Sequence, residues 1–250
     1  MNTTKYLQRI SYKGTLEPSF STLVALQKAH LLSVPFENLD IHHGIPIELD
    51  IPKLYNKIVE RNRGGFCYEL NGLFYELLKA LDFEVKRVSA RVYENEAELS
   101  PEYDHMTLLV YLSNAEYLVD VGFGKFAFGP IKLVLNTVQA DPKGTFKMDK
   151  YNDAYWRVNK KGDAGWSPEY IFTEIPRTLE DFGGMCHYHQ TSPESNFTKK
   201  RLCSLPTEEG RVTLSDDKLL ITQGQEKQEI PIEHETAFTE ALWQYFRMQI

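Results

Sequence analysis

The sequence predicts an α+β protein in which helices come first, antiparallel strands follow and a mixed segment ends the chain. Three observations support this fold class. Apolar residues recur at helical spacing through the first 82 residues, and from about residue 83 the pattern changes to alternating and β-branched runs. Short strand patterns, RVTL and KLLITQG, then return near the C-terminus before a final helix around residues 237–246.

Three helices are expected in the first part of the chain. Residues 21–32 form an amphipathic segment with Ser21 as a candidate N-cap. After an irregular stretch, Asp50 caps a second helix that extends to about Arg61, with a proline in its first turn. Two glycines end that stretch, and a third helix begins at Cys67.

The strands follow as FEVKRVSARVYE, HMTLLVYL, EYLVDVGF, KLVL and AYWRVNKKG, separated by turn residues. Their short length and sequential order indicate antiparallel strands of a barrel or a curved sheet. The chain contains no internal repeat and no low-complexity linker.

Composition limits the partners of the chain. Its 250 residues are 42% hydrophobic and 25% charged, as in soluble globular proteins. Lysine and arginine total 28 against 35 acidic residues, and the resulting net charge of −7 would repel nucleic acids and anionic membranes. No apolar run reaches the roughly 18 residues of a membrane span. We therefore expect no nucleic-acid partner and no membrane partner.

The cysteines indicate the compartment. Three cysteines are too few and too scattered for a disulfide framework, which favours a reducing cytoplasm. Cys186, His187, His189 and Cys203 match no familiar zinc spacing, so no metal site is expected.

Cys67 is the candidate nucleophile. It follows RNRGGF and begins CYELNGLFYELLKAL, whose apolar residues recur every three or four positions. Counting back from Leu70 places the thiol on the buried face of the first helical turn, after two glycines that would let a ligand approach the backbone. There the helix dipole and unpaired N–H groups favour a thiolate and could hold an oxyanion. The alternative is a buried structural cysteine, and only partner residues decide between the two.

A nucleophilic cysteine needs a base and a third group that orients the base. His105 begins one strand, and Asp120 interrupts the apolar run YLVDVGF. In a hairpin with its loop over residues 113–116 the two side chains share a face but lie about 13 Å apart along the strand. A loop over residues 111–114 places them directly opposite. The alternation of side chains along the strands therefore permits a His105–Asp120 pair but does not prove it. The alternative is a structural pairing of Asp120 with Arg91.

Taken together, these segments resemble the arylamine N-acetyltransferases. RGGFCYELNGLF contains Cys67, DHMTLLV contains His105 and VDVGFG contains Asp120, and their order and spacing match the family's three signature segments. YLQRI, VPFENLDIHHG and HQTSPESNF extend the similarity over most of the chain. By this resemblance the three residues are nucleophile, base and orienting acid.

The resemblance also implies an architecture and a reaction. It implies a helical domain over residues 1–82, a β-barrel domain over 83–191 and an α/β lid over 192–250, with a cysteine-protease-like core. Acetyl-coenzyme A would be the co-substrate and would acetylate Cys67. The acetyl group would then pass to an arylamine, arylhydrazine or N-hydroxyarylamine by a ping-pong mechanism.

Five binding residues are expected. Phe36 in VPFEN and Phe123 in VGFG match positions of the acceptor pocket, and Val92 is a further candidate. Phenylalanine provides the flat apolar wall that an aromatic acceptor needs, although phenylalanines are more often core residues. Gly124 and Lys125, just beyond the candidate aspartate, are expected to contact the pyrophosphate of coenzyme A.

Three other functions share these features. An amide synthase that closes a macrocycle would use the same cysteine, a papain-like thiol hydrolase would use the same three residues, and a silent binding module would keep only the scaffold. Turnover of a simple arylamine with acetyl-coenzyme A separates the first two from a transferase. A Cys67 that is alkylated no faster than a free thiol would indicate the third.

Overall fold

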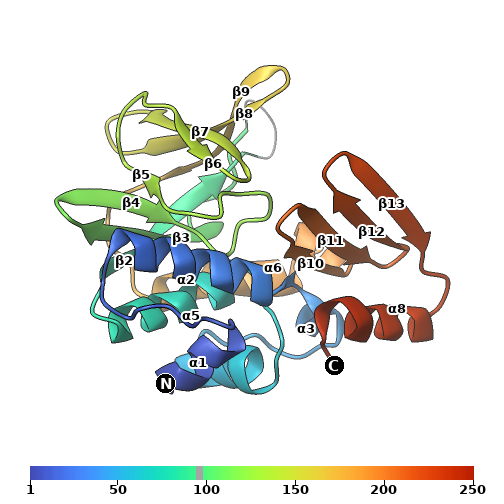
Figure 1. The fold of residues 1–250 in the computed structure, drawn as a ribbon. Helices are drawn as coiled ribbons and strands as arrows, with labels where there is room; N and C mark the ends of the chain where they lie inside the picture. Colours follow the sequence, from blue (N-terminus) through green and yellow to red (C-terminus); the bar gives the residue numbers. More distant parts are fainter. Residues whose placement is uncertain (94–97) are drawn as a thin grey trace.

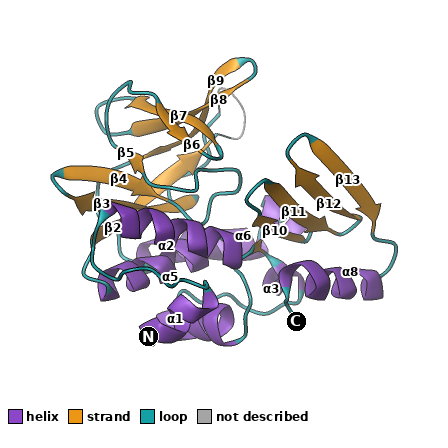
Figure 2. Cartoon of the chain, in the orientation of Figure 1, coloured by secondary structure: helices purple, strands orange, loops and turns teal. Residues whose placement is uncertain are grey.

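The computed structural model describes residues 1–93 and 98–250. It contains helices and short helical turns, which Figure 2 shows in purple: α1 (Thr3–Arg9), α2 (Phe20–Ser33), α3 (Leu39–His42), α4 (Ile51–Tyr55), the π-helical turn η1 (Asn56–Glu60), α5 (Cys67–Ala80), the 3₁₀ turn η2 (Glu180–Phe182), α6 (Gly183–Thr191), α7 (Asn196–Lys199), α8 (Glu235–Ala241) and the π-helical turn η3 (Leu242–Phe246). The strands are β1 (Phe36–Glu37), β2 (Glu84–Val92), β3 (His105–Leu112), β4 (Ala115–Val119), β5 (Ile131–Lys132), β6 (Gln139–Asp141), β7 (Gly144–Lys150), β8 (Trp156–Gly162), β9 (Gly165–Phe172), β10 (Leu202–Pro206), β11 (Gly210–Ser215), β12 (Lys218–Gln223) and β13 (Glu226–Pro231). The predicted α+β class is confirmed.

Eight antiparallel strands curve into a nearly closed barrel, in the order β5-β4-β3-β2-β9-β8-β7-β6. The edge strands β5 and β6 are joined by a side chain: the Gln139 amide donates to the Lys132 carbonyl at 2.9 Å and accepts from its N–H at 2.8 Å. A parallel bridge between Leu135 and Met148 adds to this closure. The barrel lies above α2 and α5 in Figure 1.

The second sheet has the order β1-β10-β11-β12-β13, with α8 beneath it in Figure 1. Its first strand comes from the N-terminal part of the chain, because Phe36 and Glu37 pair with Ser204 and Cys203 of β10. Phe36 also bridges to Gly65, two residues before α5. One short strand therefore connects the C-terminal sheet to the segment that leads into α5.

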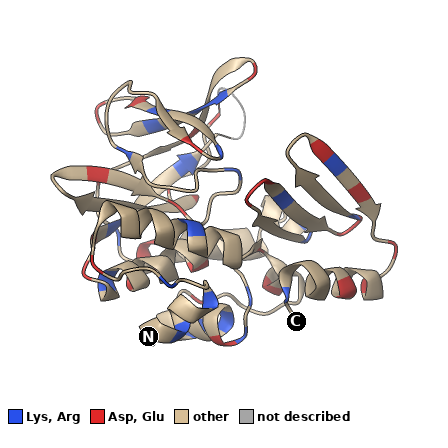
Figure 3. Ribbon diagram, in the orientation of Figure 1, with Lys and Arg blue, Asp and Glu red and all other residues tan. Residues whose placement is uncertain are grey.

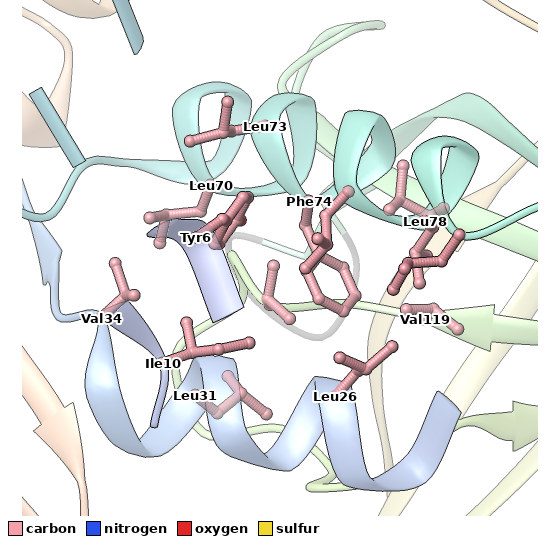
Figure 4. Close-up of a cluster of buried hydrophobic side chains, with 14 of the residues drawn as sticks. Tyr6, Ile10, Leu26, Leu31, Val34, Leu70, Leu73, Phe74, Leu78 and Val119 are labelled. Carbon is pink, nitrogen blue, oxygen red and sulfur yellow. The ribbon is translucent and has the colours of Figure 1, made fainter. Parts of the chain in front are cut away.

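Helix α5 is buried because its apolar residues form a broad face, as the sequence predicts. Figure 4 shows Leu70 and Phe74 of α5 pointing toward Ile10 and Leu26, and all four are at most 1% exposed. On its other side α5 packs against β2 and β3 of the barrel. The helix thus lies between α1, α2 and the barrel, and its first residue packs with Met106 of β3.

The predicted helix boundaries hold within two residues. Helix α2 begins at Phe20 and is capped by Ser19, rather than by Ser21, because the Ser19 hydroxyl accepts from the Thr22 N–H. The Asp50 cap is confirmed, with Oδ1 accepting from the Lys53 N–H at 3.0 Å. Helix α6 was not expected, since the sequence GGMCHYHQT shows no apolar repeat.

Candidate active site

Cys67 is the first residue of α5, as expected, and is 4% exposed. The Glu69 carboxylate reaches back to accept from the Phe66 N–H at 3.0 Å, which fixes the start of the helix. The two preceding glycines pack closely against the chain. A Cβ on Gly64 would lie 2.1 Å from the Pro35 carbonyl oxygen, and a Cβ on Gly65 would lie 2.7 Å from Glu69 Oε2, so both positions require glycine for packing.

Burial controls the protonation of the thiol. Burial raises the pKa of Cys67 well above its usual range, and the nearby charges of Asp104 and Asp120 raise it further. A hydrogen bond with the Met106 backbone opposes these effects but does not reverse them. The effect of burial thus opposes the effect of the helix dipole, which favours a thiolate. A base must remove the proton.

His105 is the candidate base. It begins β3, is 3% exposed, and its Nε2 lies 2.7 Å from Asp120 Oδ2. Because a carboxylate only accepts, Nε2 carries the proton and donates it to Asp120. The other ring nitrogen, Nδ1, is then free to accept a proton. Both His105 and Cys67 line one cavity.

The hairpin register differs from both expected registers. Leu112 pairs with Ala115, so the turn is only Ser113 and Asn114, and both have positive φ of 51° and 61°. Such a two-residue turn matches the twist of the strands. Continuing this register places Asp120 opposite Thr107, two positions from His105 on the same face. This offset of two positions is half of the four expected for a loop over residues 113–116, and the side chains of His105 and Asp120 meet diagonally across the two strands.

Asp120 is completely buried and holds four hydrogen bonds. Oδ2 accepts from His105 Nε2 and from the Tyr170 hydroxyl at 3.0 Å, and Oδ1 accepts from Asn71 Nδ2 at 2.9 Å and the Gly122 N–H at 2.8 Å. Burial alone would raise the pKa of Asp120, but the His105 charge and these hydrogen bonds outweigh it and lower the pKa. The carboxylate is thus ionised and fixed in orientation.

Arg91, the alternative partner considered for Asp120, binds elsewhere. Arg91 Nε donates to the Ser100 carbonyl at 2.7 Å, away from Asp120.

Gly122 brings the loop after β4 against the start of α5. A Cβ at this position would lie 2.7 Å from Cys67 Cα and 2.8 Å from Asn71 Nδ2. Asn71 in turn donates to the Met106 carbonyl at 2.7 Å and accepts from the Val121 N–H at 3.0 Å. Helix α5, strand β3 and the loop after β4 therefore meet at Asn71, one helical turn beyond the thiol.

A cavity of about 520 Å³ opens over these groups. It contains all three residues expected at the acceptor pocket, Phe36, Val92 and Phe123. Its other walls are Cys67, Tyr93, Pro101, Asp104, His105, Gly122, Gly124, Tyr188, His189, Glu194, Ser195, Asn196 and Phe197. The residues from α6 and α7 were missed at the sequence level, because they come from segments without a regular pattern.

A second cavity of about 480 Å³ lies between the barrel and the C-terminal sheet. It shares Phe123 and Gly124 with the first cavity and also contains Lys125. Its wall includes the basic side chains Lys143, Lys160 and Arg211, the acidic Glu208 and Glu209, and several apolar residues. Figure 3 shows acidic and basic residues interspersed on the barrel, the helices and the C-terminal sheet, so this local gathering of cations is not part of a general basic face.

Beneath the start of α5 lies a buried ion network. Lys57 Nζ is 2.8 Å from both Glu69 Oε1 and Asp40 Oδ2, and Arg63 NH2 is 2.9 Å from both Glu37 Oε1 and Asp40 Oδ1. Two cations thus face three carboxylates. Burial, with a smaller contribution from Glu37, raises the pKa of Glu69 to about 7 against the lowering effect of Lys57.

A thiol at a helix N-terminus, a histidine on a neighbouring strand and a buried aspartate beside that histidine define a cysteine-dependent acyl-transfer scaffold. The comparisons identify the family. The N-acetyltransferase family profile matches residues 19–250. Arylamine N-acetyltransferases of chicken (Gallus gallus, pineal gland isozyme NAT-10) and Mycolicibacterium smegmatis are 36% and 37% identical to the chain. These alignments cover 84% and 86% of the chain and 79% and 80% of the relatives.

Solved structures indicate the same family. The chain is similar to the Mycobacterium marinum arylamine N-acetyltransferase in complex with CoA, with a TM-score of 0.89, 29% identity and 99% and 93% of the two chains covered. It is also similar to a Bacillus cereus arylamine N-acetyltransferase described as having a unique Cys-His-Glu catalytic triad, with a TM-score of 0.92, 26% identity and full coverage of both chains. The chain belongs to the arylamine N-acetyltransferase family of acyltransferase enzymes, which confirms the predicted family.

Two further findings concern the described part of the chain. None of its helices is long and apolar enough to cross a bilayer. No group of three or more histidine, cysteine, aspartate or glutamate side chains is arranged there to hold a metal ion.

Proposed function

We propose that the protein transfers an acetyl group from acetyl-coenzyme A to an aromatic amine, hydrazine or hydroxylamine through Cys67, with His105 as the base and Asp120 as the orienting acid. The observation that carries this proposal is the 2.7 Å hydrogen bond from His105 Nε2 to the buried Asp120, in a cavity that also contains the thiol. It leaves Nδ1 as the proton acceptor.

In the first half-reaction, His105 Nδ1 removes the Cys67 proton as sulfur attacks the thioester carbonyl carbon. The tetrahedral adduct collapses, the acetyl–sulfur bond to coenzyme A breaks, and the imidazolium returns its proton to the departing thiolate. In the second, the amine nitrogen attacks the acetyl-cysteine, His105 takes the amine proton, and the same proton restores the Cys67 thiol. Asp120 stabilises the imidazolium that forms in both steps.

We propose that the cavity between the barrel and the C-terminal sheet receives the phosphates of coenzyme A. The backbone of Gly124 and the side chain of Lys125 would contact the pyrophosphate, with Lys143, Lys160 and Arg211 as additional cations. Partial burial is the main factor that lowers the pKa of the last three, and the Arg211 charge lowers the pKa of the two lysines further. A bound polyanion would relieve this unfavourable arrangement.

We propose the first cavity as the acceptor site, with Phe36, Val92 and Phe123 as apolar walls. The two cavities share Phe123 and Gly124, so donor and acceptor could reach one thiol from different sides.

We further propose that residues 1–82, 83–191 and 192–250 act as three domains. We also propose that the protein works in the cytoplasm, since Cys67, Cys186 and Cys203 are all free thiols.

The experiment is acetylation in the absence of acceptor. Incubation with acetyl-coenzyme A alone should add one acetyl group to the peptide that contains Cys67, detected by mass spectrometry, and an arylamine should remove it faster than water does. Cys67→Ser should not be acetylated at a comparable rate, because an unactivated hydroxyl is a poor nucleophile. Loss of the acetyl group at one rate with and without amine would indicate a hydrolase. An unmodified Cys67 would refute the proposal.

A further inference from the structure

A second polar array, separate from Cys67, His105 and Asp120, lies on the wall of the candidate acceptor cavity. His189 of α6 connects Ser195 to Asp104: its Nδ1 lies 3.2 Å from Ser195 Oγ, and its Nε2 lies 3.2 Å from Asp104 Oδ1. The side chains of His189 and Asp104 are only 7% and 18% exposed. All three residues line the cavity.

The proton positions follow from the partners. Ser195 Oγ accepts from the Phe197 N–H, so its own hydrogen is available for His189 Nδ1. The His189 proton then sits on Nε2, on the side of Asp104. Nε2 is close to Asp104 but makes no hydrogen bond of acceptable geometry in the structure. A buried donor and a carboxylate thus lie next to each other with unused hydrogen-bonding capacity.

Aromatic packing keeps the imidazole in place. The His189 ring stacks on Tyr68 with centroids 6.0 Å apart and meets Phe197 edge-on at 5.0 Å. The Tyr68 hydroxyl donates to the Asp104 carbonyl at 2.9 Å and so also fixes the backbone of Asp104. The pair cannot turn away from the cavity without breaking these contacts.

The charges of the two cavities are opposite. Among the residues that the structure describes, no lysine or arginine lines the cavity that contains Cys67, and the carboxylates that line it are Asp104 and Glu194. The neighbouring cavity holds four basic side chains. Aromatic walls with one half-enclosed carboxylate favour an apolar ring that carries a positive or hydrogen-bond-donating group, and they disfavour an anionic one.

We propose that Asp104, which lies next to His189, is the specificity-determining residue for the acceptor. It selects aromatic amines that carry a cationic or hydrogen-bond-donating substituent and rejects those that carry a carboxylate. An ammonium or hydroxyl substituent can donate to Asp104, and a hydroxyl can also accept from His189 Nε2, whereas a carboxylate would meet a like charge. This inference rests on the proposed function and concerns only its second half-reaction.

The test uses two acceptors of almost equal amine reactivity, 4-(aminomethyl)aniline and 4-aminophenylacetate, in which a methylene group insulates the aniline from the opposite charges. In a ping-pong reaction, kcat/KM for the acceptor reports only the steps after acetylation of Cys67, so effects on the thiol cancel. We expect the wild-type protein to prefer the cationic acceptor by at least tenfold. Asp104→Asn should reduce this preference to threefold or less, mainly through a better kcat/KM for the carboxylate.

Glu194→Gln is the matched control, because it removes the same charge from an exposed position of the same cavity. It should change the preference by less than twofold, since water screens an exposed charge. His189→Gln should weaken the preference, because the flexible amide side chain loses the ring contacts with Tyr68 and Phe197 that keep His189 beside Asp104. Thermal melting of each variant and acetylation of its Cys67 by acetyl-coenzyme A show that the first half-reaction still operates.

The outcomes are separable. If Cys67 is acetylated but the wild-type protein shows no preference for the cation, the inference about Asp104 fails and the proposed function stands. The same holds if Glu194→Gln changes the preference as much as Asp104→Asn does. If Cys67 is not acetylated, the proposed function itself fails.

Discussion

Replacement of Asp120 by asparagine should disable the reaction by changing the tautomer of His105. The carboxylate accepts from His105, Tyr170, Asn71 and Gly122, whereas an asparagine amide has one accepting oxygen and one donating NH₂ group. The Gly122 N–H is a fixed donor, and the Asn71 amide is oriented by its contacts with Met106 and Val121. The new amide oxygen must therefore face these two donors, and its NH₂ group must face His105.

The substitution affects Nδ1 of His105, the nitrogen that we propose takes the thiol proton. Facing a donor, His105 Nε2 must become an acceptor, and the ring proton moves to Nδ1. Nδ1 can then no longer remove the proton of Cys67, whose pKa is already raised by burial. In the chymotrypsin triad the same substitution lowers kcat about 10⁴-fold. We expect a loss of this order here, which corresponds to about 5 kcal/mol of activation free energy.

The assay is single-turnover acetylation of Cys67, quenched at intervals and measured by mass spectrometry. Tyr170→Phe is the control, because it removes one hydrogen bond to Asp120 and keeps the charge. It should cost about 1 kcal/mol of stability and less than tenfold in rate. If Asp120→Asn acetylates within tenfold of the wild-type rate, or if Tyr170→Phe is equally slow, the tautomer argument is wrong.

Three further substitutions test the surroundings of the thiol. Gly122→Ala should lower both stability, by about 1–3 kcal/mol, and the acetylation rate, because the new Cβ would lie 2.7 Å from Cys67 Cα; urea denaturation and the quenched assay measure the two effects. Lys57→Met should destabilise the protein by about 3–5 kcal/mol in urea denaturation, since it leaves the buried Glu69 without its cation and removes one of the two cations that bind Asp40. Because the pKa of Glu69 rises from 4.5 in the unfolded chain to about 7 in the folded protein, Glu69 should lose its stabilising effect as the pH rises through this range. Glu69→Gln should flatten that part of the pH–stability curve, and an unchanged slope would contradict the assignment.

Patterns local to the chain predicted the helices of the site well. The start of α5 at Cys67 and the cap at Asp50 follow from apolar spacing and capping chemistry, which act within one or two turns. The shared face of His105 and Asp120 follows from the strand period of two. The two-residue offset between His105 and Asp120 could not be predicted, because it depends on the turn. The left-handed backbone of Ser113 and Asn114 makes a two-residue turn, whose register lies between the two registers considered for loops over residues 111–114 and 113–116. Asn114 was the available signal, because asparagine is favoured in two-residue hairpin turns, whose backbone is left-handed.

Groups that come together only in the folded chain could not be predicted. Tyr170 is 50 residues from Asp120, and Asn71 reads as a polar position on a helix, yet both bond the buried carboxylate. The thiol shows the same limitation. A first-turn cysteine suggests a thiolate, but the packing around Cys67 decides the balance, and burial outweighs the local preference.

The ion network explains how the C-terminal sheet and the thiol can be held in one geometry. Glu37 belongs to β1, which pairs with β10, and its carboxylate accepts from Arg63 at 2.9 Å and from the Leu39 N–H at 2.8 Å. Arg63 and Lys57 both bind Asp40, and Lys57 binds Glu69. The Glu69 carboxylate caps the start of α5 next to the thiol. A continuous chain of buried charges therefore runs from the edge of the C-terminal sheet to the first turn of α5. Movement of that sheet relative to the nucleophile would require separating buried ions, which is costly, so the two cavities keep their positions on either side of Phe123.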